Sequence, residues 1–299
     1  MWKPRSSHAR KLEEKTEAEK LAYMLPSLIL AAEHLVHSFD MGVHGRRRAG
    51  TGEDFWQFKQ YGPDDAATNI DWRQSAKRDH VYIRQKEQET AETVWLWTDT
   101  SPTMDYSSDE SFTSKLSCAT ILTLATALLL SKSGEKFGLL GQYEKAATGP
   151  VTFNRFAQRL GETAVPRFAG LTATERLSSK STILLISDFL SPIEDITGVV
   201  RQFVDLGCNG FLFHIADPAE VDLPFQGRTK FEGLMQEENL TLGRVETIRQ
   251  DYQDLFQAHK NRLISFASSV SWEYSFHRTD SAVSEALAKI YTALCVKGA

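Results

Sequence analysis

Three short apolar segments in the second part of the chain each stop at an aspartate. Their branched and aromatic residues, uninterrupted by Gly or Pro, are typical of buried strands. Stretches with apolar residues at helical spacing separate them, and strands that alternate with helices predict a mainly parallel sheet with helices on both faces. The segments and their acids are Val94–Thr98 with Asp99, Ser181–Ser187 with Asp188, and Phe211–Ala216 with Asp217.

The alternation continues to the end of the chain and predicts an α/β domain over residues 93–299. Residues 217–243 do not follow this alternation of strands and helices. Within them, Arg228–Gly233 and Leu240–Leu242 resemble a small inserted β-hairpin. Further strands are expected at Phe137–Leu140 and Val270–His277, and helices at Cys118–Leu129, Thr152–Leu160, Ile193–Leu206, Thr247–Ala267 and Val283–Cys295.

Composition narrows the class of protein. A net charge of -5 argues against a dedicated nucleic-acid binder, in which clustered positive charge is expected. The three cysteines are far apart and show no metal-ligand spacing, which suits a reducing compartment. The apolar runs Leu21–Phe39 and Leu116–Ser131 are too polar or too short to span a bilayer. We therefore expect a cytoplasmic protein without membrane insertion.

Residues 1–41 are expected to form a polar tail followed by an amphipathic helix over Leu21–Phe39. Residues 42–92 form a separate arm in which basic and aromatic residues are interleaved. This mixture suggests phosphate or partner contacts, but nearby acids almost balance the charge, so we favour internal Arg–carboxylate pairing. The residues of the arm that could still contact a partner are Arg46, Arg47, Arg48, Asp71, Trp72 and Arg73.

The loop after the first strand reads Asp99-Thr100-Ser101-Pro102-Thr103. Its oxygen-bearing side chains alternate, so Asp99, Ser101 and Thr103 could converge on one hard cation, and Mg²⁺ needs few protein ligands. Asp188 should lie on the same edge of the sheet, because parallel strands end together. The alternative is that these residues only cap the following helix.

Several ordered motifs of this chain resemble the bacterial family known as domain of unknown function 58. The motifs are Gly50-Thr51-Gly52-Glu53-Asp54-Phe55, Tyr61-Gly62-Pro63-Asp64-Asp65, Ile70-Asp71-Trp72-Arg73-Gln74-Ser75-Ala76-Lys77, Tyr82-Ile83-Arg84, Asp99-Thr100-Ser101-Pro102-Thr103-Met104 and Ile186-Ser187-Asp188-Phe189-Leu190-Ser191-Pro192. The resemblance implies a Rossmann-like von Willebrand factor A-type domain with a metal-ion-dependent adhesion site for Mg²⁺ or Mn²⁺. Asp99, Ser101 and Asp188 match that site, and Thr103 stands where Ser is usual. Thr163, Thr172 and Thr174 are the candidates for its distant threonine.

The same resemblance implies a MoxR-type AAA+ ATPase as the partner, with this chain as the adaptor that recognises a client protein. We therefore expect a non-catalytic interaction module and assign no catalytic residue. The alternative is a metal-dependent hydrolase or phosphatase that uses Asp99. An aspartyl-phosphate enzyme wants a second acid two residues after the nucleophile, and position 101 is a serine.

Overall fold

The computed structural model describes residues 24–39, 55–60, 72–75, 81–86, 93–142, 145–162, 168–172, 177–232 and 239–296. The chain divides into two compact units. One unit is Gly42–Ala91, and the other combines Met1–Met41 with Glu92–Ala299.

The larger unit is built on a five-stranded sheet with the order β4-β3-β5-β6-β9, in which all neighbours are parallel. The parallel sheet predicted from the alternating pattern is therefore confirmed. The central strand β5 is buried along its whole length, as expected for a strand with neighbours on both sides and helices on both faces. The strands are β3 (Thr93–Thr98), β4 (Lys136–Leu139), β5 (Thr182–Ser187), β6 (Asn209–Ala216) and β9 (Glu273–Arg278).

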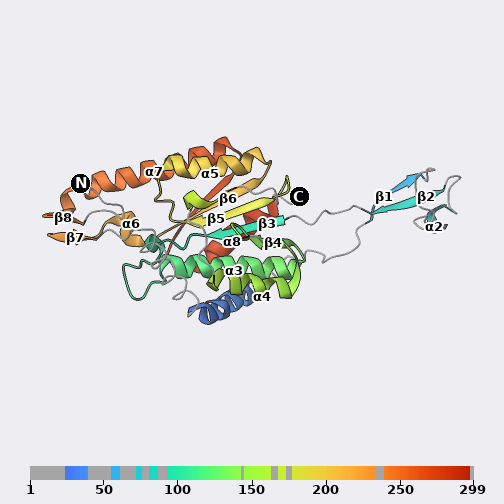
Figure 1. Ribbon diagram of the computed structural model, residues 1–299, viewed down its shortest axis with the longest axis horizontal. Helices are drawn as coiled ribbons and strands as arrows, with labels where there is room; N and C mark the ends of the chain where they lie inside the picture. Colours follow the sequence, from blue (N-terminus) through green and yellow to red (C-terminus); the bar gives the residue numbers. More distant parts are fainter. Residues whose placement is uncertain are drawn as a thin grey trace. The chain divides into compact units, whose positions relative to one another are not determined.

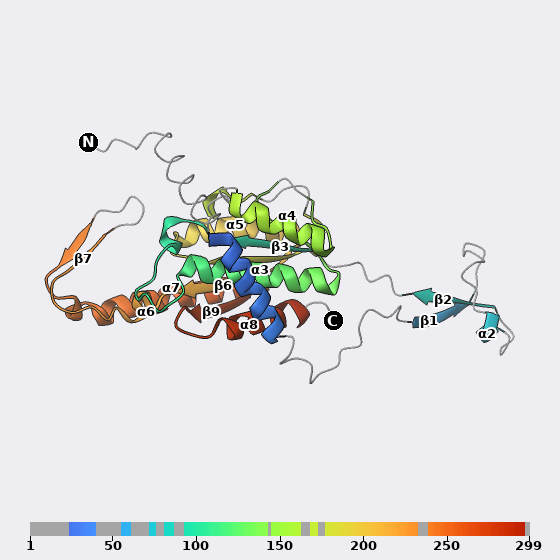
Figure 2. The same cartoon turned by 90° about the horizontal axis from the view of Figure 1, so that it is seen from below.

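Helices cover both faces of this sheet (Figure 1). Helices α5 (Ile193–Asp205) and α7 (Arg249–Ser269) lie on one face. Helices α3 (Lys115–Ser133) and α8 (Val283–Val296) lie on the other, as the view from below shows (Figure 2).

Two more helices complete the second face. Helix α4 (Gly149–Glu162) packs beside α3 next to the edge strand β4, and the helix over residues 24–39 crosses the same face. Leu28, Ala32 and Val36 of that helix enter the hydrophobic core at a spacing of one helical turn.

Helix α3 is the most deeply enclosed helix of the fold. Its apolar and small residues are buried on several sides, so it lacks the single apolar stripe of a surface helix. Within the described residues it is the one helix long and apolar enough to cross a bilayer, and 67% of its most apolar window is buried in the structure. A core helix meets the same criterion. Ser114 caps its first turn, and Gly134 ends it with a φ of 80°.

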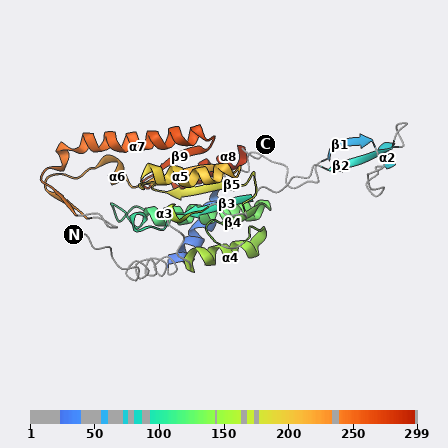
Figure 3. The ribbon, with the colours of Figure 1, turned by 45° about the horizontal axis from the view of Figure 1, so that its top comes forward.

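The break in the rhythm after β6 contains a short helix and a hairpin. Helix α6 (Pro218–Asp222) follows the strand directly, and β7 (Thr229–Phe231) pairs antiparallel with β8 (Leu240–Leu242). Both lie beyond the C-terminal ends of the sheet strands, where α7 also begins (Figure 3). The sequence predicted this hairpin but not α6.

The smaller unit contains an antiparallel pair, β1 (Phe55–Gln60) with β2 (Tyr82–Lys86), and the short helix α2 (Trp72–Ser75) between them. Of the possible partner-binding residues, Trp72 is 70% exposed and Arg73 belongs to α2. Arg46, Arg47, Arg48 and Asp71 lie outside the described residues.

Candidate functional site

The C-terminal edge of the sheet carries Asp99, Asp188 and Asp217, and we call this edge the rim. The strands β3, β5 and β6 that precede these acids are consecutive in the sheet, with Thr98 opposite Ile186 and Ser187 opposite His214. The Asp99 amide donates to the Ile186 carbonyl at 2.9 Å, which extends the ladder into the loop. The fold therefore brings to one edge acids that are between 29 and 118 residues apart in sequence.

Asp99 is buried, with 5% of its surface exposed, and neutral groups hold its carboxylate. Its Oδ1 accepts a hydrogen bond from the Ser101 amide at 2.9 Å, and its Oδ2 accepts one from the Ser187 hydroxyl at 2.7 Å. Burial raises the pKa of the Asp99 carboxyl and the Asp188 carboxylate raises it further, while the bonds from Ser187 and Ser101 act in the opposite direction. Among the described residues, no basic side chain forms an ion pair with it.

The two hydroxyls of the loop lie side by side. The oxygens of Ser101 and Thr103 are 2.9 Å apart. Ser101 precedes a single 3-10 turn over Pro102–Met104, and its side chain makes no capping bond to that turn. Capping of the next helix is done by Ser114, so the capping alternative does not account for the Ser101 and Thr103 hydroxyls.

Asp188 has a cationic partner. Its Oδ2 is 2.9 Å from the Nζ of Lys115, and its Oδ1 accepts a hydrogen bond from the Leu190 amide at 3.2 Å. Phe189, between Asp188 and Leu190 in the chain, has a backbone φ of 47°, which is uncommon for a bulky residue. The Ser187 hydroxyl accepts from the Phe189 amide, and His259 on α7 contacts the Phe189 carbonyl at 2.7 Å. These contacts fix the loop that carries Asp188.

Lys115, the first residue of α3, was missed by sequence reasoning. Its side chain is fully buried between Asp188 and Glu220, with which it forms a second ion pair. Burial alone lowers the pKa of the amine, but the two carboxylates outweigh burial and raise it. The available signal was a lysine at the start of an otherwise apolar helix, where the helix dipole favours an acid.

Asp217 binds backbone amides at the rim. It caps α6, accepting from the Ala219 amide at 2.8 Å, while Glu220 reaches back to the Asp217 amide at 2.9 Å. Its other oxygen accepts from the Ser108 amide at 2.9 Å. With both oxygens occupied by backbone donors, Asp217 ties α6 to the loop that precedes α3.

Of the candidate distant threonines, Thr172 is exposed, and Thr163 and Thr174 lie outside the described residues. The structure thus brings together Asp99, Ser101, Thr103 and Asp188, and adds Lys115 and Glu220.

A sequence profile described as "Protein of unknown function DUF58" matches residues 57–262, more than half of the chain. The chain belongs to this DUF58 family. No curated protein matches it at a significant level.

The solved structures that match this DUF58 chain are distant from it. An aerotolerance-related membrane protein from Bacteroides fragilis is 14% identical with a TM-score of 0.39, and the match covers 68% of this chain and 98% of that one. The conserved hypothetical protein BatB from Bacteroides thetaiotaomicron is 14% identical with a TM-score of 0.39, and the match covers 69% of this chain and 98% of that one. An uncharacterized membrane spanning protein from Vibrio fischeri is 16% identical with a TM-score of 0.19, and the match covers 69% of this chain and 98% of that one. Two of these three proteins are described as membrane proteins, and the third is named BatB.

The side chains at the rim of this DUF58 chain bear on whether a divalent cation fits there. No three His, Cys, Asp or Glu side chains of the described residues form a metal-binding group. The set of two acids and two hydroxyls is nevertheless compatible with Mg²⁺. Carboxylate and hydroxyl oxygens are hard ligands of the kind that Mg²⁺ accepts, and the Ser101 and Thr103 hydroxyls are hydrogen-bonded to each other at 2.9 Å.

The pairing of the carboxylates at the rim is a second consideration. Two of the rim acids, Asp188 and Glu220, contact the buried amine of Lys115, whereas Asp99 and Asp217 form no ion pair with a basic side chain of the described residues. Buried carboxylates are stable when they are paired or bound to a metal. Lys115 pairs with two of them, and Asp217 is held by backbone amides. Asp99 is the rim acid that receives only neutral donors from the described residues.

Proposed function

We propose that this DUF58 chain is a non-catalytic protein-binding module that docks through a divalent cation held at the rim. The observation that carries the proposal is the state of Asp99. Its carboxylate is buried, is close enough to Asp188 to have its pKa raised, and receives only neutral donors from the described residues. A bound cation would relieve this repulsion and desolvation.

Asp99, Ser101 and Thr103 would hold the ion, and Asp188 would share its charge between the ion and Lys115. Mg²⁺ usually keeps several waters when one or two carboxylates bind it. A coordination position occupied by water could be taken by a carboxylate of a partner protein. Binding, rather than turnover, is the chemistry that this arrangement favours.

Hydrolysis or phosphoryl transfer at Asp99 has less support. An aspartyl-phosphate enzyme needs a second acid two residues after the nucleophile, and position 101 is a serine. The nearest lysine, Lys115, is committed to Asp188 and Glu220. An aspartyl nucleophile would need that positive charge on its own side.

For the partner, we propose a MoxR-type AAA+ ATPase and its client, on the basis of the family resemblance. An adhesion-type site of the von Willebrand factor A kind would suit such an adaptor, because one acidic side chain of the partner completes it. A partner that hydrolyses ATP would meet this chain in the cytoplasm.

The test is calorimetric titration of Mg²⁺ and Mn²⁺ into the metal-free full-length protein. Wild type should bind one equivalent, and Asp99→Asn should bind at least about tenfold more weakly, because a charged ligand is replaced by a neutral one. Asp109→Asn is the matched control, since Asp109 is an exposed acid of the loop before α3. Absence of binding, or equal binding by Asp99→Asn, would overturn the cation site.

The partner is tested separately by co-purification with a MoxR-type ATPase from the same genome, with Mg²⁺ and with EDTA. Retention that requires both Mg²⁺ and Asp99 supports docking through the ion. Turnover of a generic phosphoester that is lost in Asp99→Asn would favour the hydrolase instead.

A further inference from the structure

The loop that carries Asp188 has a backbone conformation that needs support from its surroundings. Phe189 has a φ of 47°, in the left-handed region that bulky residues rarely adopt. Its ring is 1% exposed and packs edge-on against Phe168 and His214, with centroids 5.9 Å away in both cases. Residues in such conformations persist when several contacts hold them, and they are common at binding sites. The contacts that hold Phe189 therefore bear on the cation site.

Hydrogen bonds hold both ends of the Phe189 backbone. Its N–H donates to the Ser187 hydroxyl at 3.0 Å. Its carbonyl is 2.7 Å from the Nε2 of His259, and because a carbonyl only accepts, Nε2 is the donor. The next amide, that of Leu190, donates to Asp188 Oδ1 at 3.2 Å. Of these three bonds, the one from His259 is the only one that comes from another element, helix α7.

The Ser187 hydroxyl connects this backbone to both acids of the candidate cation site. It accepts from the Phe189 amide and donates to Asp99 Oδ2 at 2.7 Å. Asp188 is the residue directly before Phe189. A shift of the Phe189 backbone would therefore move Asp188 and disturb the bond that orients Asp99. Mg²⁺ demands near-ideal octahedral geometry, and contacts that orient its ligands typically change affinity by about 10–100-fold when they are lost.

The position of His259 is set by the core and not by the loop that it contacts. Phe256 and Leu263, one helical turn before and after it on α7, are both buried. The Phe256 ring meets those of His214 and Phe276, with centroids 6.0 and 6.3 Å away. His259 itself is half-buried, so its bond to the loop is partly shielded from water. Helix α7 can therefore hold the loop from a fixed point.

We propose that His259 is a positioning residue of the cation site. It holds the Phe189 carbonyl from α7 and does not touch the ion. Asp188 and the Ser187–Asp99 bond thereby keep the geometry that binds the ion. The inference rests on the proposed cation site and adds its regulation, because it couples that site to helix α7. Such coupling is reciprocal: the ion steadies the loop against α7, and a partner that pulls His259 away from the loop lowers the affinity for the ion.

The first measurement needs no cation. Hydrogen exchange of the full-length protein in EDTA, followed by mass spectrometry, reports on the amides of residues 187–191. His259→Phe keeps a ring on α7 but has no donor for the Phe189 carbonyl, so these amides should exchange at least about tenfold faster than in wild type. Exchange within β5 should not change. Equal exchange of residues 187–191 in the two proteins would overturn the proposal.

The second measurement is calorimetric titration of Mn²⁺ into the same proteins. His259→Phe should bind the ion at least about tenfold more weakly, because the loop that carries Asp188 is no longer held. His259→Gln should recover most of the affinity, since the Gln Nε2 is as many bonds from the backbone as the His Nε2 and can donate to the same carbonyl. Tighter binding by His259→Phe than by His259→Gln would mean that the imidazole only fills space, and it would overturn the proposal.

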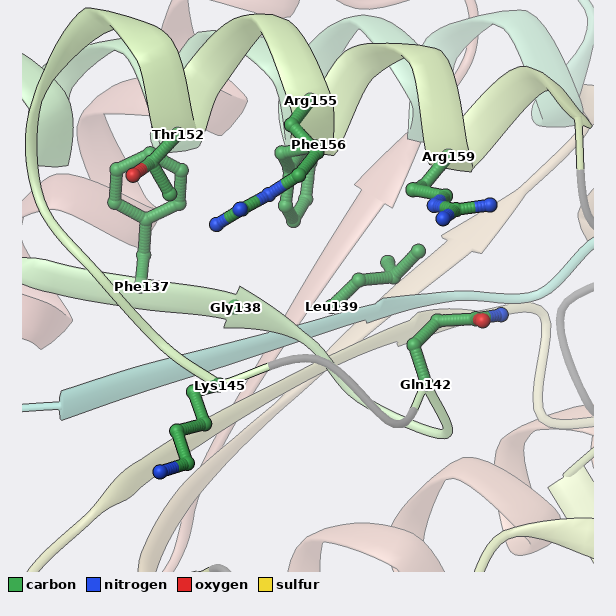
Figure 4. A pocket seen from close by; sticks show the side chains of 9 residues that line it. All are labelled: Phe137, Gly138, Leu139, Gln142, Lys145, Thr152, Arg155, Phe156 and Arg159. Carbon is green, nitrogen blue, oxygen red and sulfur yellow. The ribbon is translucent and has the colours of Figure 1, made fainter.

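Two control variants each lose one hydrogen bond to a backbone carbonyl away from the Asp188 loop. Tyr252→Phe removes the bond from α7 to the Glu220 carbonyl at 2.7 Å. Thr152→Val removes the bond to the Thr148 carbonyl at 2.8 Å, in a pocket between β4 and α4 that shares no residue with the rim (Figure 4). Both should keep the Mn²⁺ affinity within about twofold of wild type. Circular dichroism verifies that all variants are folded.

The outcomes separate this inference from the proposed function. If wild type binds Mn²⁺ and His259→Phe binds it equally well, the positioning role of His259 is overturned and the cation site stands. If wild type binds no Mn²⁺, the proposed function is overturned, and the coupling of α7 to the cation is overturned with it.

Discussion

The two loops that bring Asp99 and Asp188 to the rim hold their carboxylates in opposite ways. Asp188 is 3% exposed and is paired with the Nζ of Lys115. Asp99 is 5% exposed, and among the described residues it receives only the neutral donors Ser101 and Ser187. Buried charges cost several kcal/mol each unless they are paired. The charge of Asp188 should therefore support the fold through its pair, whereas the charge of Asp99 should oppose folding of the metal-free protein.

Loss of the buried amine should give the largest effect. Lys115→Met leaves Asp188 and Glu220 close together without a counter-ion, and removal of one partner from a buried pair costs about 3–5 kcal/mol. Urea unfolding followed by circular dichroism measures this loss. A loss below about 1 kcal/mol would contradict a buried, charged Lys115.

Two further variants separate charge from packing in that experiment. Lys136→Met removes an exposed lysine of β4 and should change stability by less than about 0.5 kcal/mol. Lys115→Met/Asp188→Asn removes charge on both sides and should recover part of the loss, because one of the uncompensated carboxylates is gone.

Glu220→Gln should have an intermediate effect. Glu220 is 18% exposed, and Lys115 keeps its bond to Asp188 when the second partner is neutralised. The capping bond to the Asp217 amide can be kept by the Gln carbonyl, although the amide group then faces Lys115. We expect a loss of about 1.5–3 kcal/mol, the range for a hydrogen bond to a charged group. A loss as large as that of Lys115→Met would mean that Glu220, not Asp188, is the main counter-ion.

Asp99→Asn should stabilise the metal-free protein. Because the folded-state pKa of Asp99 is raised, the ionised carboxylate disfavours folding above that pKa, and stability increases as the pH falls through it toward the ordinary value of 3.8. Asn carries no charge, so at pH 7 it should gain about 0.5–2 kcal/mol. The gain should disappear below pH 3.8. Thermal melting in EDTA from pH 3 to 7 measures it, and a destabilised Asp99→Asn at pH 7 would contradict the account.

The strands that carry the rim could be predicted because their signal is local. Each is an apolar run that stops at an acid, and the parallel order follows from the helices between them. Boundaries were less accurate near the C-terminus. The last strand was expected from Val270 but begins at Glu273, because α7 continues to Ser269 and Ser271 adopts a φ of 57°.

The burial of the Lys115 side chain could not be predicted from the sequence. A lysine is normally exposed, and its burial here depends on Asp188 and Glu220, which lie 73 and 105 residues away along the chain. Only the folded topology places those two acids against the start of α3. Helix α6, by contrast, was not predicted although the sequence contains a local signal for it, since Asp217-Pro218-Ala219-Glu220 has the spacing of a capping box.

The smallest effect on stability is expected at the two hydroxyls of the Asp99 loop. Thr103→Val keeps the shape of the side chain and removes the hydrogen bond between the neutral hydroxyls of Ser101 and Thr103, of which Thr103 is only half-buried. The free energy of unfolding of the metal-free protein should therefore fall by less than about 1 kcal/mol. Mg²⁺ affinity should nevertheless decrease, because Val offers no oxygen to the ion. Urea unfolding in EDTA and calorimetric titration measure the two quantities. If Thr103→Val is destabilised as strongly as Lys115→Met, the Asp99 loop also supports the fold through its polar contacts, and the contrast between a charge-paired Asp188 loop and a neutral Asp99 loop does not hold.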